Sequence, residues 1–351
     1  MLRLSKSLFI FNFNNLNLYA PNNMTKFIKR VVVFVLIFSA GFCSLLYFYC
    51  MVLQVPSCYY IDQSIDKIVL GNSHPQCALN DSLISDFRNF ASSGESFMYS
   101  YSKAKIIIHN NPQLKYAFIE LSNNMITDDI DNNWIRGRHQ IFKNIEYYLP
   151  LLGIKELMII FEDQWGLLAP ALSKFLIKNS YSVLIELAGD GESVMCSDKR
   201  VGYYRLETAT IDSLLAIAEQ DEESKKYEKV KLSVLDLGYL DELLAYCELN
   251  NVKPILLRSP VHPACTCLDN EDLYESLVRK KYGRYLMLDF KDFPLLNSDY
   301  ADMDHLNYRG SEKFSHYMDK LIKAGVLLLD EPQAWIDSTI CEMEGSDTMN
   351  K

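Results

Sequence analysis

Short apolar segments alternate with longer segments of helical spacing from Asp62 onward. The apolar segments at 65–70, 116–121, 252–257 and 285–288 each stop at polar or turn residues. This alternation predicts an α/β domain around a mostly parallel sheet, which we place at residues 62–330. In such sheets the reacting groups collect beyond the carboxyl ends of the strands. The residues that follow each apolar segment are therefore the first candidates for a functional role.

The segment from about 128 to 231 interrupts this alternation. It carries apolar stretches such as YYLPLLGIKELMIIF and LLAPALSKFLI, followed by the polar LAGDGESVMCSDKR. We interpret it as a mainly helical insertion that either packs over one face or edge of the sheet or lies close to a membrane. Residues 331–351 end in EMEGSDTMNK, and we expect them to form a frayed C-terminal tail.

The N-terminal region predicts one transmembrane helix at 31–53, where no residue is charged. At about 1.5 Å per residue this segment is long enough to cross a hydrocarbon core of about 30 Å. The preceding cluster TKFIKR favours a cytoplasmic segment at 1–30 and an extracytoplasmic domain at the plasma or inner membrane, periplasmic in a Gram-negative cell. A second start at Met24 would make residues 1–23 an upstream extension.

A cleaved signal peptide is the alternative to a membrane anchor. Its apolar core usually has about 7–15 residues and ends at a small-x-small site. The apolar segment here is longer, and the LQVP that follows offers no such site. The anchor is therefore the preferred interpretation.

Composition narrows the classes of protein further. A hydrophobic content of 49% excludes a disordered chain, and a net charge of −10 without a basic stripe argues against a nucleic-acid partner. The 9 cysteines have no framework spacing. The stretch His262-Pro-Ala-Cys265-Thr-Cys267 has the ligand types of half a metal site, but no second cluster completes it. We expect loop cysteines or one disulfide.

The segment KIVLGNSH delivers a serine and a histidine directly after an apolar strand signal. The predicted strand stops at Gly71, and Asn72, Ser73 and His74 follow. A serine in this position is often only a turn residue or a helix cap. It is also where a nucleophile would lie in a parallel sheet, so its assignment depends on whether the chain supplies a base.

A second motif, ADMDHLNYRGSEKF, supplies such a base near the C-terminus. Asp302 and His305 lie three residues apart, and Asn307 is placed to cap a helix with an apolar stripe. A carboxylate in this position can accept the Nδ1 proton of the histidine and leave Nε2 free as a base, which a serine nucleophile needs. We therefore identify Ser73, His305 and Asp302 as candidate catalytic residues.

Together the two motifs resemble the first and last blocks of the SGNH/GDSL hydrolase superfamily. The first block of that family usually reads Gly-Asp-Ser, and Asn72 replaces the aspartate here. The last block is Asp-x-x-His, and its H-L-N-x-x-G continuation is similar to membrane-anchored bacterial members. The resemblance covers about 62–121 and 252–328. It implies a flavodoxin-like three-layer fold, a Ser-His-Asp triad and no cofactor.

The resemblance also implies an oxyanion hole made by the Ser73 backbone N–H, a glycine and an asparagine. Gly94, in NFASSGES after the strand-like segment 87–91, matches the glycine block. The asparagine block of the family reads Gly-x-Asn-Asp, and its counterpart here, ELSNN, lacks the glycine. Asn123 and Asn124 are both candidates for the donor, and Asn123 is the first choice.

Three further polar residues accompany the candidate triad. We expect the His74 ring to point away from the Ser73 hydroxyl and to line the pocket or cap a helix, with Asn72 also supporting the site. Asp304 is either an acceptor behind the triad or solvated. A divalent metal site of His74, Asp302, Asp304 and His305 is an alternative with suitable ligand types, but no other part of the chain supports it.

The leading functional interpretation is a membrane-anchored serine esterase or acyltransferase acting on acylated glycans of the cell envelope or on small esters. This layout is similar to envelope families that transfer D-alanyl groups or acetylate polysaccharides. An inactive SGNH-like accessory or binding subunit of the surface-polysaccharide machinery is one alternative. A purely structural membrane protein, in which Ser73 is a cap and Asp-x-x-His a loop, is the other.

Overall fold

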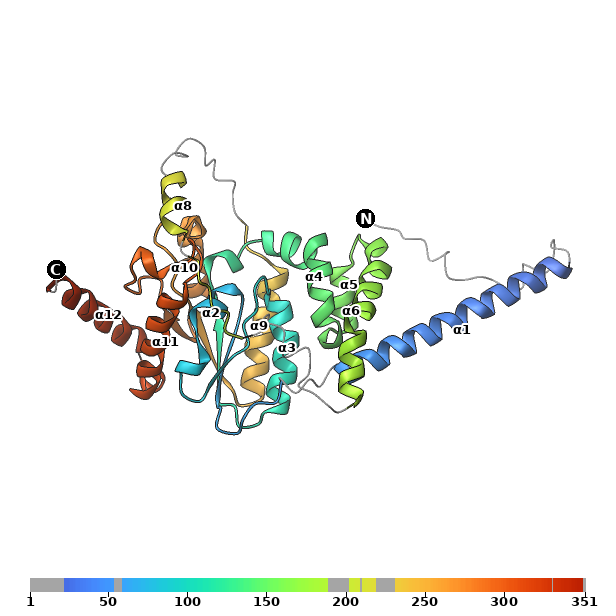
Figure 1. Ribbon diagram of the computed structural model, residues 1–351, viewed down its shortest axis with the longest axis horizontal. Helices are drawn as coiled ribbons and strands as arrows, with labels where there is room; N and C mark the ends of the chain where they lie inside the picture. Colours follow the sequence, from blue (N-terminus) through green and yellow to red (C-terminus); the bar gives the residue numbers. More distant parts are fainter. Residues whose placement is uncertain are drawn as a thin grey trace. The chain divides into compact units, whose positions relative to one another are not determined.

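The structure, a computed structural model, describes residues 22–53, 59–188, 202–208, 210–218, 231–329 and 331–349 (Figure 1). The chain divides into two compact units, Met1–Met51 and Val52–Lys351. The first unit contains most of a single long helix, α1 (Asn22–Leu53). The second unit contains every other described helix and strand, so it is the unit that holds the candidate site.

Helix α1 is long and apolar enough to cross a membrane. The qualifying span is Met24–Val52, with a mean hydropathy of 2.5, and none of it is buried inside the protein. Large apolar side chains such as Phe34 and Ile37 are exposed along it. The predicted N-terminal apolar helix is therefore present, and it begins earlier than residue 31 because the basic residues before the span are also helical.

The second unit alternates strands and helices. Its strands are β1 (Lys67–Leu70), β2 (Phe87–Asn89), β3 (Tyr116–Glu120), β4 (Lys253–Arg258) and β5 (Leu286–Asp289). Its helices are α2 (Ser73–Ala78), α3 (Phe97–Asn110), α4 (Arg138–Tyr148), α5 (Ile154–Ile160), α6 (Leu168–Ala188), α8 (Ile211–Ala218), α9 (Leu235–Leu249), α10 (Glu271–Leu277), α11 (Tyr308–Lys323) and α12 (Pro332–Met349). The connections also contain short 3-10 turns and two π-helical segments, Ile130–Ile135 and Val278–Tyr282.

The five strands form one sheet in the order β2-β1-β3-β4-β5, and every pair is parallel. The prediction of an α/β domain with a mostly parallel sheet is confirmed. This order is that of flavodoxin-like doubly wound sheets. The chain passes from β1 to the edge strand β2 and then returns to β3 on the other side, so the order reverses at β1. Ligands in such sheets bind beyond the carboxyl ends of the strands at this reversal, which is where Ser73 lies.

Side-chain alternation along the strands gives the sheet two apolar faces. Val69, Phe118 and Leu257 contribute to a core cluster with Phe314 and Met318 of α11. The neighbouring residues on the same strands point to the opposite face, where α9 contacts β4 and packs along α3 (Figure 1). The four residues of β1 are all buried, as expected for a central strand of a parallel sheet covered on both faces.

The two ends of the long connection between β3 and β4 are paired with each other. Thr127 and Leu232 form an isolated antiparallel bridge, and the Asp128 N–H donates to the Lys231 carbonyl at 2.9 Å. Between these residues, the part that the structure describes contains α4, α5, α6 and α8 and no strand. This agrees with the expected mainly helical insertion at about 128–231.

The segment 331–351, expected to be a frayed tail, instead contains helix α12. Ile336 and Ile340 of this helix are buried in the same core cluster as α11. Gln333 also fastens it to the sheet, since its side chain accepts from the Asp289 N–H and donates to the Asp289 carbonyl, both at 2.9 Å. The polar residues of α12 outnumber its apolar ones, so the helical spacing of Ile336 and Ile340 was not recognised in the sequence.

Candidate active site

The turn after β1 places Ser73 at the start of a helix. Gly71 has φ +148°, and a Cβ atom there would lie 2.5 Å from Glu120 Cβ, so the position requires glycine. Asn72 then caps α2, because its side-chain oxygen accepts from the His74 N–H at 2.9 Å. Asparagine therefore performs the capping that an aspartate would perform at this position.

Ser73, His305 and Asp302 form a continuous hydrogen-bonded chain. Ser73 Oγ lies 2.8 Å from His305 Nε2, and His305 Nδ1 lies 2.8 Å and 3.0 Å from the two Asp302 oxygens. A carboxylate only accepts, so Nδ1 carries the proton toward Asp302 and Nε2 accepts the serine hydroxyl. The spacings lie in the 2.6–3.2 Å range that a nucleophile and its base require. All three side chains are partly exposed, which leaves them accessible to a substrate.

The loop around Asp302 holds this carboxylate in place. Asp302 Oδ1 also accepts the backbone N–H groups of Asp304 and His305, each at 2.9 Å. Partial burial by itself would raise the pKa of Asp302, but the hydrogen bonds and the attraction of His305 hold this pKa below its ordinary value. The charged carboxylate is therefore favoured, and it can orient the imidazole and stabilise its protonated form.

His74 and Asn124 form a second polar contact behind the triad. The His74 ring is buried, and its Nε2 lies 3.2 Å from Asn124 Nδ2, while its Nδ1 faces Glu120 Oε1 at 3.7 Å. The rings of His74 and His305 are nearly perpendicular, with their centroids 5.7 Å apart. An amide nitrogen only donates, so His74 Nε2 accepts and Nδ1 carries the proton. The ring thus lies between the asparagine and the carboxylate of Glu120.

The two candidate asparagines of the asparagine block have different surroundings in the structure. Asn124 is partly exposed beside His74, and its Oδ1 accepts from Ser122 Oγ at 3.0 Å and from Asn72 Nδ2 at 3.5 Å. Asn123 is buried and belongs to a different cluster around Arg258. Asn124, the second choice from the sequence, is the asparagine that lies at the candidate site.

Gly94 lies in the loop after β2, which continues toward the turn that holds Ser73. The Ser92 N–H donates to the Gly71 carbonyl at 2.9 Å, and Gly94 has φ +72°, a conformation that favours glycine. Among the described residues, none accepts a hydrogen bond from the backbone N–H of Ser73 or of Gly94. These two donors are therefore free to bind an anionic oxygen.

A buried ion pair that sequence reasoning missed anchors this loop. Glu95 and Lys103 are both buried, with Lys103 Nζ 2.5 Å from Glu95 Oε2, and Ser100 and Tyr148 also donate to Glu95. Burial lowers the pKa of Lys103 despite the opposing attraction of Glu95. The i, i+8 spacing carries no helical or strand signal, so the pair becomes visible only in three dimensions.

The segment 202–208 of the insertion lies across the same end of the sheet. Its backbone bonds to three separated parts of the site region: Gly202 N–H to the Ala91 carbonyl, Tyr204 N–H to Gln76, and Tyr308 N–H to Leu206. Arg205 stacks over the Tyr308 ring at 4.4 Å. No periodic pattern of apolar residues predicts this placement, because the segment forms neither helix nor strand.

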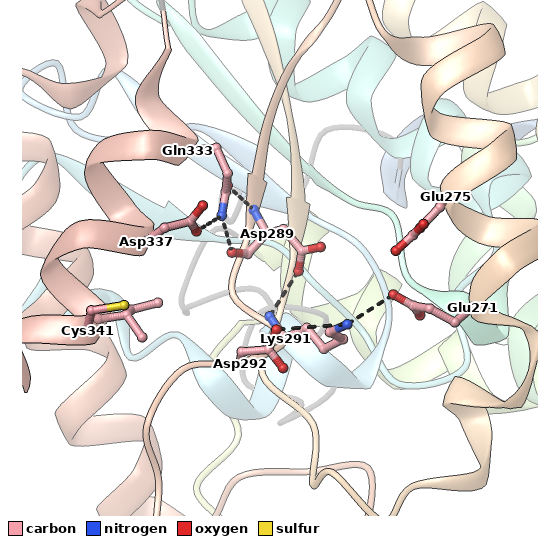
Figure 2. A pocket seen from close by; sticks show the side chains of 9 residues that line it. Glu271, Glu275, Asp289, Lys291, Asp292, Gln333, Asp337 and Cys341 are labelled. Carbon is pink, nitrogen blue, oxygen red and sulfur yellow. Dashed lines mark hydrogen bonds and ion pairs between the residues drawn. The ribbon is translucent and has the colours of Figure 1, made fainter. Parts of the chain in front are cut away.

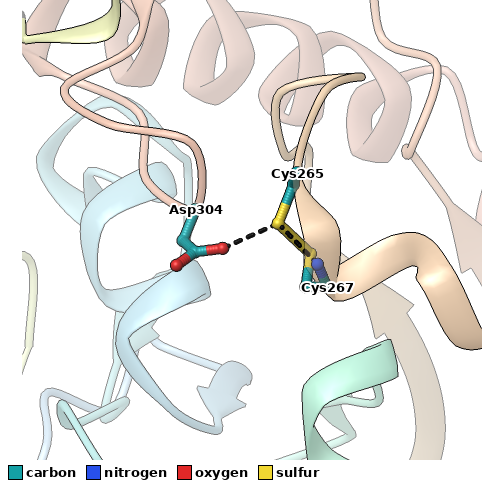
Figure 3. A group of neighbouring side chains, drawn as sticks. All are labelled: Cys265, Cys267 and Asp304. Atoms are coloured by element: carbon teal, nitrogen blue, oxygen red, sulfur yellow. Dashed lines mark hydrogen bonds between the residues drawn. A yellow bond between two sulfur atoms is a disulfide. The ribbon is translucent and has the colours of Figure 1, made fainter. Parts of the chain in front are cut away.

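Cys265 and Cys267 form the expected single disulfide in the described part of the chain, beside Asp304 (Figure 3). Cys265 Sγ lies 2.8 Å from Asp304 Oδ1, so the Asp304 side chain points toward the sulfur atoms. These three residues are the group of possible metal ligands found among the described residues, with ligand atoms within 4.8 Å of one another. The alternative site of His74, Asp302, Asp304 and His305 does not form such a group there.

A separate cavity lies between β5, α10 and α12 (Figure 2). It is lined mainly by charged side chains, and none of the candidate triad residues lines it. Figure 2 shows Lys291 reaching between Asp289 and Glu271, whereas Gln333 and Asp337 approach from α12. This polar cavity borders the buried guanidinium of Arg258, which pairs with Glu271 at 2.5 Å and with Asp289 at 3.1 Å.

Comparison with known proteins does not assign a function to this site. A protein-family model that carries no functional description matches residues 201–327, a stretch that contains Asp302 and His305 but not Ser73. No curated protein matches the chain. The functional assignment therefore depends on the chemistry of the site.

Proposed function

We propose that the protein is a membrane-anchored serine esterase or acyltransferase of the SGNH type, acting on acyl groups of cell-envelope or surface glycans. The observation that supports this most directly is the hydrogen-bonded chain from Ser73 through His305 to Asp302. A serine on a sharp strand-to-helix turn, a base and an orienting carboxylate are the three parts that acyl transfer requires.

The proposed reaction proceeds through an acyl-enzyme. Ser73 Oγ attacks the ester carbonyl while His305 Nε2 takes the serine proton, which gives a tetrahedral intermediate with a negatively charged oxygen. Collapse of this intermediate breaks the ester bond, and the protonated imidazole donates its proton to the leaving alcohol. Water or a glycan hydroxyl then attacks the acyl-enzyme, with His305 again acting as the base. Asp302 orients the imidazole and stabilises its charge throughout.

The oxyanion would be bound by the N–H groups of Ser73 and Gly94 and by the side chain of Asn124. An amide nitrogen has two N–H donors. One donates to His74 Nε2 at 3.2 Å, and the second would remain for the substrate oxygen. His74 thereby acts as a positioning residue that sets the amide orientation, with Glu120 on the far side of its ring.

Two features support the SGNH assignment beyond the triad. The strand order is that of flavodoxin-like sheets, as the family resemblance implies. The candidate blocks also follow consecutive strands that lie side by side: Ser73 after β1, Gly94 after β2 and Asn124 after β3. Because parallel strands end at one edge of the sheet, these residues share that edge with the loop of His305.

We also propose that α1 anchors the enzyme with its domain outside the cytoplasmic membrane. Lys26, Lys29 and Arg30 precede the apolar span, and basic residues are retained on the cytoplasmic side. A protease added to intact spheroplasts should therefore remove the domain and leave an N-terminal fragment in the membrane. Protection of the domain in intact spheroplasts, with cleavage only after they are lysed, would reverse this orientation.

A fluorophosphonate probe tests the catalytic assignment directly. The full chain in detergent should be labelled at Ser73, and labelling should disappear in Ser73→Ala and fall strongly in His305→Ala. Ser93→Ala is a matched control, because this serine lies in the neighbouring loop and bonds to Gln76. Absence of labelling in the folded wild-type chain would overturn the enzyme assignment in favour of an accessory SGNH-like subunit.

A further inference from the structure

Helix α6 is apolar on two opposite faces. Ala171, Phe175 and Val183 are buried on its inner face. On the opposite side Ile177, Tyr181 and Leu184 are 79%, 67% and 64% exposed. These three residues follow the i, i+4, i+7 spacing of one helical stripe, which we call the outer face of α6. Isolated exposed apolar side chains are common, but a continuous stripe indicates a surface that is covered by a partner.

The C-terminal half of α6 lies beside the place where the chain enters the domain. Asn179 of α6 donates to the Glu146 carbonyl of α4 at 2.9 Å. Two residues further along α4, the Tyr148 hydroxyl donates to Glu95, which also binds Lys103. Lys103 donates to the Phe90 carbonyl, and the ring of Phe90 lies 6.4 Å from that of Tyr59, the first described residue after α1. Tyr59 is fixed to the domain, because its carbonyl accepts from Asn111 Nδ2 at 2.6 Å. Helix α6 thus packs, through α4, on the part of the domain to which the anchor is attached.

The chain between the anchor and the domain is short. Residues 54–58 separate the end of α1 at Leu53 from Tyr59. Fully extended, these six peptide steps span at most roughly 20 Å. If α1 crosses a bilayer, the attachment point at Tyr59 therefore stays within this distance of the membrane surface, so the lipid is the surface nearest to this part of the domain.

The charges beside the outer face suit a membrane of bacterial composition. Lys174 and Lys178 lie along the flank of α6, with side chains 46% and 47% exposed. Both pair with one carboxylate, Glu146, so this flank keeps an excess of positive charge. Lysine side chains at the edge of an apolar stripe reach toward anionic headgroups while their stems lie along apolar surface.

We propose that the outer face of α6 is a lipid-binding surface that lies in the interface of the bilayer on the domain side. Ile177, Tyr181 and Leu184 enter the headgroup and upper acyl region, as in interfacial amphipathic helices. The inference depends on the anchor that is part of the proposed function, and it is independent of the catalytic chemistry. It implies that the domain is attached to the membrane at two points instead of one.

Photolabelling by lipid tests this surface in the full chain. The protein is reconstituted into vesicles of phosphatidylethanolamine and phosphatidylglycerol that contain a phospholipid with a diazirine in its acyl chain. After irradiation, mass spectrometry of peptides should find lipid adducts in α1 and in residues 177–184. Leu249, which is 81% exposed on α9, should carry none.

Two matched variants sharpen the test. Leu184→Glu should lower adducts in α6 by roughly ten-fold, since a carboxylate is costly in the apolar region, and should leave adducts in α1 unchanged. Leu249→Glu makes the same change at an exposed leucine on another helix and should alter neither. Unchanged circular dichroism spectra and melting temperatures would show that both variants remain folded.

The possible outcomes separate this inference from the anchor. Adducts in α1 without adducts in α6 would overturn the lipid-binding surface and leave the anchor standing. Absence of adducts in α1 would overturn both. Chain-to-chain cross-links at Tyr181, without lipid adducts, would assign the outer face to a second copy of the chain and would likewise overturn the proposal.

Discussion

Two polar clusters lie at the carboxyl ends of neighbouring strands, and the adjacent residues Asn123 and Asn124 belong to different ones. Asn124 bonds to His74 in the candidate active site. Asn123 Oδ1 accepts from Arg258, and its Nδ2 donates to Glu271 at 2.8 Å. One 3-10 turn, Asn123–Met125, therefore supplies both clusters from consecutive positions.

The difference between the clusters is whether their hydrogen-bonding groups are satisfied. In the Arg258 cluster the buried guanidinium is paired with Glu271, Asp289 and Asn123, and Lys291 completes the pairing of Glu271 at 3.2 Å. At the candidate active site the N–H groups of Ser73 and Gly94 have no acceptor among the described residues. A satisfied cluster stabilises the fold, whereas backbone donors without an acceptor are available to bind the oxyanion of a reaction intermediate.

Removing the base should give the largest effect on activity and almost none on stability. His305→Ala should lower kcat for an aryl acetate by about 10⁴-fold or more, because Ser73 loses its proton acceptor. The His305 side chain is partly exposed, so the melting temperature should change little. Wild-type turnover that equals that of His305→Ala would contradict the assignment of this cluster as catalytic.

Removing the guanidinium should produce the converse result. Arg258→Met leaves two carboxylates and Asn123 without their partner and should destabilise the domain by about 3–5 kcal/mol. Urea denaturation monitored by circular dichroism measures this loss. Turnover by the fraction that remains folded should stay near the wild-type value. Little change in stability would show that the cluster is not the structural element described above.

The two asparagines give the most closely matched comparison. Asn124→Ala should lower kcat by about 10²–10³-fold, the usual effect of losing one oxyanion donor, with little loss of stability. Asn123→Ala should leave kcat unchanged and cost about 1–3 kcal/mol of folding free energy, because buried polar partners lose a hydrogen bond. Equal losses of kcat in both variants would show that activity depends on the shape of the shared turn, and that the Asn124 amide has no special role in it.

The strands and the candidate triad were accessible from sequence because both depend on local patterns. Apolar runs that end in polar residues mark buried parallel strands, and the spacing of Asp302 and His305 lets both lie on one side of a turn. The choice between Asn123 and Asn124 was not accessible, since it depends on the direction that each side chain takes within a single helical turn. That direction is set by Arg258 of β4 and His74 of α2, which lie far from both asparagines in the sequence.

Contacts between segments that are distant in the sequence could also not be predicted from its patterns. Lys103 looks like a surface residue of an amphipathic helix, yet it is buried because Glu95 reaches it from the preceding loop. The segment 202–208 has no periodicity, yet its backbone bonds to the loops around Ser73 and His305. In both cases the position is determined by contacts with residues from another segment, and neighbouring residues in the sequence give no indication of it.

The smallest predicted effect concerns the pH dependence of stability. Burial alone would raise the pKa of Glu271, but the hydrogen bonds of Arg258 and Asn123 and the charge of Arg258 lower this pKa to about 2, from an ordinary value of 4.5. A carboxyl whose pKa is lower in the folded state stabilises the fold above pH 4.5, and this contribution is lost as the pH falls toward 2.

Glu271→Gln removes this contribution while keeping the shape of the side chain. The variant should be less stable than the wild type at pH 7, and the difference should narrow as the pH falls from about 4.5 toward 2. Urea midpoints measured across this range test the expectation, and Glu275→Gln, on the same helix and at the same cavity, is a suitable control. A difference that stays constant with pH would mean that the charge of Glu271 contributes nothing, and that the Arg258 cluster is held by its geometry instead of by ionic pairing.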